Sequence, residues 1–236
     1  MKGVTAAILA GGLGTRLRPL VADCPKVLAE VRGRPFLSYL LDELVAFDVK
    51  DVVICTGYLG ERVWSTFGDT YGDIRLYYSQ ESFPLGTAGA LRLALPLLRS
   101  DSLLVMNGDS FFAIDLSGFW SWHCSHRASA SIALVNMSDT TRYGRVLLDA
   151  EGVVLSFEEK SAAGTPGWIN GGIYLVARTL LLTIPESRAV SLEQEVFPAW
   201  IGKGLYGYKS QGRFLDIGTP ETYKAAEDFF SRETPV

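Results

Sequence analysis

Glycines and basic residues near the N-terminus have the types and spacing needed to bind phosphate. The segment Gly11-Gly12-Leu13-Gly14-Thr15-Arg16 follows an apolar run, and Pro25-Lys26 comes about ten residues later. Glycines after a buried strand let backbone N–H groups approach a phosphate closely, and Arg and Lys side chains pair with its charge. A dinucleotide fingerprint would need Gly or Ala at Leu17, and a P-loop would need Gly-Lys-Ser/Thr. The segment therefore indicates a polyphosphate ligand but matches neither of these motifs.

Other polar residues stand at the ends of apolar segments. Asn107-Gly108-Asp109 ends a buried run, which is where ligands bind in open α/β sheets. Gly86-Thr87-Ala88 opens a helical segment, where Thr87 could also serve as a simple N-cap. Glu158-Glu159-Lys160, taken alone, is typical of a solvent-exposed charge run.

The elements that must position these residues alternate between strands and helices in the first half of the chain. Apolar runs predict strands at residues 4–10, 52–55, 74–79 and 103–106. Helical stripes predict helices at residues 36–45, 61–67 and 88–98. This order predicts an α/β fold with a Rossmann-like, doubly wound, mostly parallel sheet.

Beyond about residue 128 the pattern changes to short strands separated by turns. Strands are predicted at residues 130–135, 146–148, 153–158, 173–176 and 214–217, and a helix at 192–200. A last helix is predicted to begin at Pro220, with Thr219 as its N-cap. We expect one domain over residues 1–236, with a nucleotide-binding half (about 1–127) and a smaller mixed α+β sugar-binding half (about 128–236).

Composition excludes several classes of protein. The apolar content of 48% and charged content of 20% exclude a disordered chain, and apolar runs are too short for a membrane span. The net charge of −4 argues against a nucleic-acid partner. Three widely spaced cysteines form no CxxC pair, and His123-Cys124 with His126 lacks distant partners for a metal site. Reduced thiols indicate a cytoplasmic location.

The whole series of motifs resembles the sugar-nucleotide pyrophosphorylases, the nucleotidyltransferases that join a nucleoside triphosphate to a sugar 1-phosphate. The Gly11–Pro19 run with Pro25-Lys26 is similar to the family signature, and the later motifs follow in the expected order. Gly108-Asp109-Ser110-Phe111-Phe112, Tyr143-Gly144 and Ile169-Asn170-Gly171-Gly172 are most similar to the D-glycero-α-D-manno-heptose 1-phosphate guanylyltransferase branch. The resemblance implies the nucleotide-diphospho-sugar transferase fold.

The resemblance also implies a role for each matching residue. Arg16 and Lys26 are expected to be catalytic, and Asp109 and Asp216 to bind Mg²⁺, a cation that suits carboxylates, waters and phosphates. Residues expected to bind the nucleotide are Leu9, Ala10, Gly11, Gly12, Gly14, Thr15, Gln80, Gly86, Thr87 and Ala88. Those expected to bind the sugar phosphate are Asn107, Gly108, Tyr143, Gly144, Glu159, Lys160 and Asn170.

The expected partners are therefore GTP and D-glycero-α-D-manno-heptose 1-phosphate, with no nucleic acid, no membrane and a homodimer as an open option. Mannose 1-phosphate, or a uridylyl or thymidylyl transfer, is the alternative chemistry. A catalytically silent sugar-nucleotide sensor is the alternative from another class, and it would be expected to lack Arg16, Lys26, Asp109 or Asp216, all of which are present. A nicotinamide-dependent oxidoreductase would need the dinucleotide fingerprint that is missing at Leu17.

Overall fold

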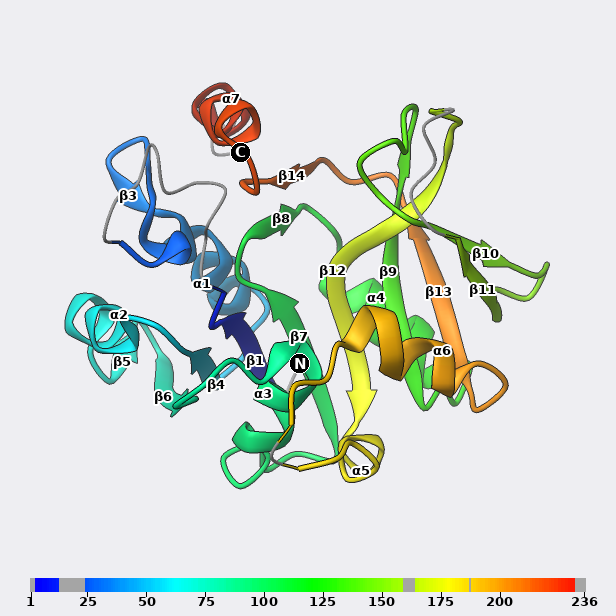
Figure 1. Ribbon diagram of the computed structural model, residues 1–236, viewed down its shortest axis with the longest axis horizontal. Coiled ribbons are helices and arrows are strands. Elements are labelled where there is room, and N and C mark those ends of the chain that lie inside the picture. The colour runs from blue at the N-terminus through cyan, green and yellow to red at the C-terminus, as the bar shows by residue number, and fades with distance from the viewer. Residues whose placement is uncertain (1–2, 13–23, 159–163, 187, 232–236) are drawn as a thin grey trace.

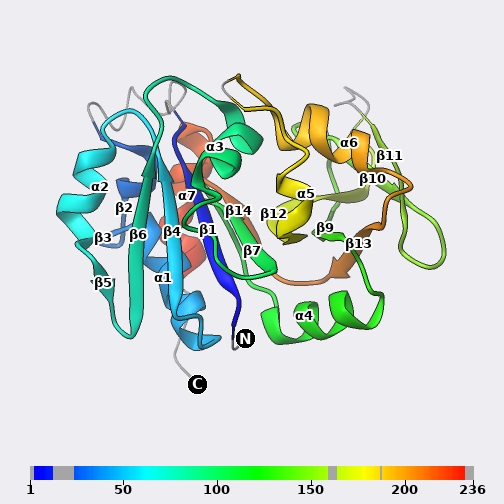
Figure 2. The same ribbon diagram turned by 90° about the horizontal axis from the view of Figure 1, so that it is seen from below.

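The computed structural model describes residues 3–12, 24–158, 164–186 and 188–231 of the 236-residue chain. Within these ranges the central feature is a ten-stranded mixed sheet that runs without a break through both halves of the chain. Figures 1 and 2 both show it extending from β6 on one side, through β1 and β7, to β9 and β13 on the other.

Four parallel strands form the N-terminal part of the sheet. In spatial order they are β7 (Ser102–Asn107), β1 (Thr5–Ala10), β4 (Asp51–Thr56) and β6 (Ile74–Gln80), and the short β5 (Thr70–Tyr71) pairs antiparallel with β6. The three inner strands β7, β1 and β4 coincide with apolar runs, because strands covered on both faces need apolar residues at successive positions, whereas β6 contains both buried and exposed residues.

Helices cover both faces of these strands. Along β1, Ala6 and Ile8 face a core that includes residues of α1 (Phe36–Ala46), α2 (Gly60–Phe67), α4 (Leu116–Ser125) and α7 (Pro220–Ser231). The intervening Ala7 faces a second core with residues of α3 (Gly86–Ala94), α5 (Arg178–Leu181) and α6 (Phe197–Trp200). Successive strand residues point to opposite faces, so this division confirms the predicted doubly wound α/β fold.

The C-terminal part of the sheet is built around β12 (Gly167–Ala177), which is antiparallel to both β7 and β9 (Ala130–Met137). β13 (Leu205–Ser210) is parallel to β9, while β10 (Arg145–Leu148) and β11 (Val154–Glu158) form an antiparallel pair at the edge. The register of β12 against β9 shifts between Asn170 and Tyr174. Such a bulge redirects side chains locally.

Small elements complete the described chain. They are η1 (Lys26–Leu28), the hairpin of β2 (Glu30–Val31) and β3 (Arg34–Pro35), and the antiparallel pair of β8 (Ser110–Phe112) and β14 (Phe214–Asp216). α7 packs over this pair (Figure 1), with Phe230 against Phe111 at a ring-centroid distance of 5.0 Å. The α7 helix therefore packs against β8, the strand that pairs with β14.

The structure differs from the sequence prediction at several elements, among them β13, β8 and the β2–β3 hairpin, for which no strand was predicted. α3 ends at Ala94 rather than at residue 98, close to Pro96. The helix predicted at 192–200 is a π-helix, η2 (Leu192–Val196), followed by α6, because Pro198 lacks the N–H that a regular α-helix would use there. The strand predicted at 173–176 is the end of the much longer β12, and α4 has no counterpart in the prediction.

Candidate active site

Two adjoining hollows lie beyond the carboxyl ends of β1 and β7. The smaller pocket has a volume of about 310 Å³ and is lined by the ends of β1 and β7, η1 and the start of α3. The larger cleft has a volume of about 1010 Å³ and is lined by the β8–β14 pair, the edge strands and η2. Asn107 and Asp109 line both. The two hollows therefore meet at the end of β7, where ligands bind in open α/β sheets.

The smaller pocket contains most of the residues predicted to bind a nucleotide. Leu9, Ala10, Gly11 and Gly12 line it from the end of β1, and Gly86 and Thr87 line it from the start of α3.

Gly86 is required in this pocket by its backbone. Its φ is +70°, and a Cβ atom at this position would lie 2.6 Å from the carbonyl oxygen of Val190. The same oxygen accepts a hydrogen bond from the Ala88 N–H at 3.0 Å. The start of α3 is thus clamped to the segment before η2, and only glycine fits at the point of contact.

Glu81 is a residue of the smaller pocket that the sequence interpretation missed. Its Oε2 accepts a hydrogen bond from the Leu85 N–H at 3.0 Å, and its Oε1 lies 2.9 Å from the Cβ position of Gly11. Burial raises the pKa of this carboxyl, and the Leu85 hydrogen bond partly opposes the rise. The adjacent Gln80, predicted for this role, is exposed and does not line either hollow.

Lys26 brings a positive charge to the junction of the two hollows. Its Nζ lies 2.6 Å from Asp109 Oδ2, with the lysine side chain 11% exposed and the aspartate 49% exposed. The buried Val27 and Leu28 of η1 hold the lysine in this position. A largely buried ammonium beside a half-exposed carboxylate is well placed to meet an anionic ligand.

Asp216 lies next to Asp109 although the two are far apart in the sequence. In the β8–β14 ladder Asp216 is paired with Ser110, and the Ile217 N–H donates to the carbonyl oxygen of Asp109 at 2.9 Å. The two aspartates therefore stand on adjacent segments at one rim.

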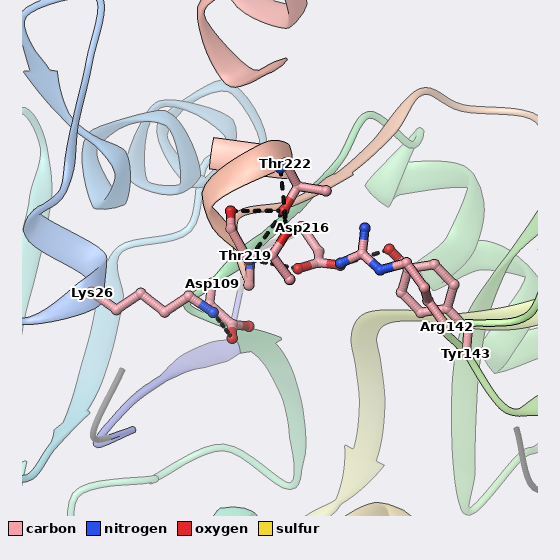
Figure 3. Close-up of polar contacts among 8 residues, drawn as sticks. Lys26, Asp109, Arg142, Tyr143, Asp216, Thr219 and Thr222 are labelled. Atoms are coloured by element: carbon pink, nitrogen blue, oxygen red, sulfur yellow. Dashed lines mark hydrogen bonds and ion pairs between the residues drawn. The ribbon is translucent and has the colours of Figure 1, made fainter. Parts of the chain in front are cut away.

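Hydrogen bonds fix the Asp216 carboxylate (Figure 3). Its Oδ2 accepts from the Tyr143 hydroxyl at 2.6 Å and from Arg142 at 3.4 Å, and its Oδ1 accepts from the Gly218 N–H at 2.5 Å. Burial, followed by the contact with Asp216, raises the pKa of Tyr143, so its hydroxyl remains a donor.

Two carboxylates at the junction fit a magnesium ion. Mg²⁺ is a hard cation that is usually held by one or two carboxylates, with water and phosphate oxygens completing its shell. In the ranges that the structure describes, no group of three or more His, Cys, Asp and Glu side chains could hold a metal. Asp109 and Asp216 thus match a site shared with a phosphate ligand rather than a cage made by protein alone.

The larger cleft contains Tyr143, Gly144 and Asn170, three of the residues predicted to bind a sugar phosphate. Its wall also includes Arg145 and Glu158, which form an ion pair between β10 and β11. Polar side chains on several walls give this cleft the donors and acceptors that a polyhydroxylated ligand needs.

Some predicted residues lie elsewhere. Ala88 is fully buried in the core behind α3. Gly108 is also buried, and a Cβ atom there would lie 2.6 Å from the Leu9 carbonyl oxygen, so its glycine permits the close approach of β7 to β1. Five predicted residues lie outside the described residues: Gly14, Thr15, Arg16, Glu159 and Lys160.

The chain is similar to known proteins in both sequence and structure. The Nucleotidyl transferase family matches residues 5–233. The chain is 35% identical to D-glycero-alpha-D-manno-heptose 1-phosphate guanylyltransferase of Aneurinibacillus thermoaerophilus, covering 94% of this chain and 96% of that protein. It is 37% identical to mannose-1-phosphate guanylyltransferase of Mycobacterium tuberculosis, covering 93% of this chain but only 62% of that protein.

A solved structure shares the fold. The crystal structure of HddC from Yersinia pseudotuberculosis complexed with GMP-PN superposes with a TM-score of 0.84 at 29% identity, covering 96% of this chain and 99% of that one. In the part of the chain that the structure describes, every helix is too short or too polar to cross a membrane. The family match and the relative at 35% identity over almost its whole length show that the chain belongs to the Nucleotidyl transferase family.

Proposed function

We propose that this chain transfers GMP from GTP to a sugar 1-phosphate and releases pyrophosphate, with D-glycero-α-D-manno-heptose 1-phosphate as the favoured acceptor. One observation carries the proposal: the smaller pocket and the larger cleft meet at Asp109 and Asn107, beside the Lys26 ammonium. A nucleoside triphosphate in the pocket and a sugar phosphate in the cleft would bring their phosphates together at this point.

The reaction needs positioning and charge stabilisation rather than a base. A phosphate oxygen of the sugar 1-phosphate is already an anion, so it can attack the α-phosphorus without losing a proton. The protein must align two negatively charged partners and stabilise the charge that develops on the α-phosphate and the pyrophosphate. Lys26 is proposed as one cation for this role, because its Nζ lies 2.6 Å from Asp109 at the junction, and Arg16 is proposed as the second. No covalent intermediate on the protein is required.

Asp109 and Asp216 are proposed to hold Mg²⁺ against the triphosphate. The bound ion supplies a positive charge that neutralises the phosphate oxygens. The Tyr143 hydroxyl and the Gly218 N–H hold the Asp216 carboxylate in one orientation at the wall of the larger cleft, while Asp109, 49% exposed, lines both hollows.

Base selection is assigned to Glu81 rather than Gln80. A carboxylate accepts hydrogen bonds only, and the Watson–Crick edge of guanine offers N–H donors from both its ring and its amino group. Adenine and cytosine present an unprotonated ring nitrogen there instead, and uracil and thymine present one N–H between two carbonyls. A mismatched base would leave Glu81 partly unpaired, at a cost of roughly 1–3 kcal/mol. GTP is therefore expected to be used about 10- to 100-fold better than the other nucleotides.

The heptose acceptor is supported by the relative from Aneurinibacillus thermoaerophilus, whose printed name specifies that substrate. The cleft volume of about 1010 Å³ leaves room for a heptose as well as a hexose. Mannose 1-phosphate, which the name of the Mycobacterium tuberculosis relative specifies, is the alternative. We further propose a cytoplasmic location, since the cysteines in the described ranges are free thiols.

A panel assay tests this function. The chain is incubated with each nucleoside triphosphate, MgCl₂ and a panel of sugar 1-phosphates, and pyrophosphate release is followed. GTP with a manno-configured sugar 1-phosphate is expected to give the highest kcat/KM. Preference for UTP, CTP or dTTP would contradict the assignment of GTP as the substrate but not the proposed nucleotidyl transfer. Ligand binding without turnover for any pair would favour a non-catalytic sensor.

A further inference from the structure

Glu193, a half-buried residue of η2, bridges the two hollows. Its Oε2 accepts a hydrogen bond from the Thr87 hydroxyl at 3.0 Å, and Thr87 lines the smaller pocket. Its Oε1 accepts from the Tyr174 hydroxyl at 3.4 Å, and Glu193 itself lines the larger cleft. One carboxylate thus contacts a residue of the proposed GTP site and a residue behind the proposed sugar-phosphate site.

The hydroxyls on the Oε2 side can act only as donors to Glu193. The Thr87 oxygen already accepts a hydrogen bond from the Leu192 N–H at 2.8 Å. The Ser191 hydroxyl also donates to Oε2 at 3.0 Å, and its oxygen accepts from the Gln194 N–H at 3.2 Å. Because a backbone N–H cannot accept, both hydroxyl protons are directed toward the carboxylate.

The Tyr174 hydroxyl is likewise a hydrogen-bond donor to Glu193. Tyr174 is completely buried, and its oxygen accepts from Asn170 Nδ2 at 2.9 Å and Asn107 Nδ2 at 3.3 Å. The orientation of Asn170 is set independently, since its Oδ1 accepts from the Gly172 N–H at 2.8 Å. Burial, and then the charge of Glu193, raise the pKa of Tyr174 well above its ordinary value, so its proton remains available to Glu193.

We infer that Glu193 is a positioning residue that couples the two substrate sites, by holding Thr87 on the GTP side and, through Tyr174, Asn107 and Asn170 on the sugar-phosphate side. This inference rests on the proposed function for the identity of the two substrates. It assigns Glu193 no contact with the reacting atoms. Its effect is to keep both sites in the single arrangement that binds both ligands.

The polarity of the network makes the isosteric Glu193→Gln variant a demanding test. Three hydroxyl donors converge on two carboxylate oxygens, whereas a glutamine has one oxygen and an NH₂ group that cannot accept. At least one hydroxyl therefore loses its acceptor. We expect KM to rise roughly five- to twentyfold for both GTP and the sugar 1-phosphate. Simple loss of folded protein would lower the apparent kcat and leave both KM values unchanged.

Glu195→Gln is the matched control on the same element. Glu195 is exposed and lines neither hollow, and it accepts hydrogen bonds from Arg188 and from the Ser191 N–H without a hydrogen bond to Glu193, Thr87 or Tyr174. The substitution is chemically identical, so it reproduces any general effect of removing a negative charge from η2. Both KM values are expected to stay within about twofold of wild type.

A double-mutant cycle tests the coupling itself. Thr87→Val and Tyr174→Phe are combined in the wild-type background and again in the Glu193→Gln background, and kcat/KM is measured for each. If Glu193 couples the two sites, the fold-loss of kcat/KM in the Thr87→Val/Tyr174→Phe double variant should differ from the product of the two single fold-losses by more than about threefold when Glu193 is present. In the Glu193→Gln background, the fold-loss of the double variant should equal the product of the two single fold-losses. Unchanged KM values in Glu193→Gln, or multiplication in both backgrounds, would overturn the inference.

The same set of proteins separates this inference from the proposed function. If the wild type releases no pyrophosphate with GTP and any sugar 1-phosphate, the proposed function fails. The coupling is then judged from calorimetric Kd values for GTP and for mannose 1-phosphate in the same variants. A rise in both Kd values in Glu193→Gln but not in Glu195→Gln would support it, and any other pattern, including a wild type that binds neither ligand, would reject it.

Discussion

Charged groups at the junction of the two hollows are the residues on which the proposed chemistry depends. The Lys26 ammonium and the Asp109 carboxylate form a pair at 2.6 Å, and Asp216 stands on the adjacent segment. Their arrangement concentrates opposite charges where two phosphates would meet. Such preorganised charge acts on the transition state without further reorganisation.

Lys26→Ala is expected to lower kcat by roughly 10²–10³-fold, as for the loss of one preorganised donor. The fold should be intact, because the remaining Asp109 is 49% exposed and can be solvated. Steady-state kinetics and thermal melting measure both quantities. Lys50→Ala removes a lysine from a surface ion pair with Asp48 and serves as the control. More than about a third of wild-type turnover in Lys26→Ala would show that the lysine is not catalytic.

Asp109→Asn and Asp216→Asn are each expected to weaken the dependence of activity on Mg²⁺. If both hold one ion, the double variant should lose little more than the worse single variant. The measurement is kcat/KM over a MgCl₂ titration. Asp51→Asn, which disrupts a surface pair with Arg75, is the control. If the fold-loss of kcat/KM in the double variant equals the product of the two single fold-losses, the two aspartates have separate structural roles.

At the scale of elements, the sequence predicted the strands far better than the contacts that complete the site. The run at residues 103–106 is apolar throughout and the run at 4–10 is apolar apart from Thr5, so burial on both faces is evident from their composition. The pairing of β8 with β14 joins segments far apart in the chain, and no local pattern encodes it. Gln80 was expected at the nucleotide site only from the family resemblance, and in the structure it is exposed at the end of β6 while the next residue, Glu81, lines the pocket.

Gly86→Ala tests the clamp between α3 and the segment before η2. The added methyl group would lie 2.6 Å from the Val190 oxygen, in addition to the strain of an alanine at φ +70°. Gly33→Ala places an alanine at φ +72° with no atom within 4 Å, so it reports the backbone strain alone, about 1–2 kcal/mol. Urea unfolding should show the larger loss for Gly86→Ala, together with a higher KM for GTP. Equal losses would mean that the clamp adds nothing.

The buried His123 of α4 is expected to make the stability of the folded chain depend on pH. Burial lowers its pKa to about 4, and its Nδ1 lies 2.8 Å from Ser131 Oγ on β9. In the unfolded chain this histidine takes up a proton near pH 6.5. The contribution of the buried neutral His123 to the free energy of unfolding is therefore fully present above that pH. It is lost progressively as the pH falls toward 4.

Between pH 7 and pH 5 this group should account for about 2 kcal/mol of lost unfolding free energy. Urea unfolding of wild type and His123→Gln at both pH values measures the difference. His126→Gln is the control, since His126 is only partly buried at the end of α4. An identical pH dependence in wild type and His123→Gln would show that the histidine does not titrate in this way.

On the scale of the whole molecule, one sheet carries both hollows. β7 contributes Asn107 to each of them, and β12, its antiparallel neighbour, contributes Asn170 to the larger cleft. The fold and the family were predictable from the sequence because the motifs span nearly the whole chain in order. The position of Glu193 between the hollows was not, because it depends on the π-helical geometry of η2 and on packing against α3.

In the proposed reaction, a phosphate oxygen of the sugar 1-phosphate attacks the α-phosphorus of GTP. The most direct test uses a sugar 1-phosphate whose non-bridging phosphate oxygens are ¹⁸O, with mass spectrometry of both products. Attack by that oxygen should leave all of the label in the GDP-sugar and none in pyrophosphate. Label in released phosphate or pyrophosphate, or a GDP-sugar without label, would contradict it.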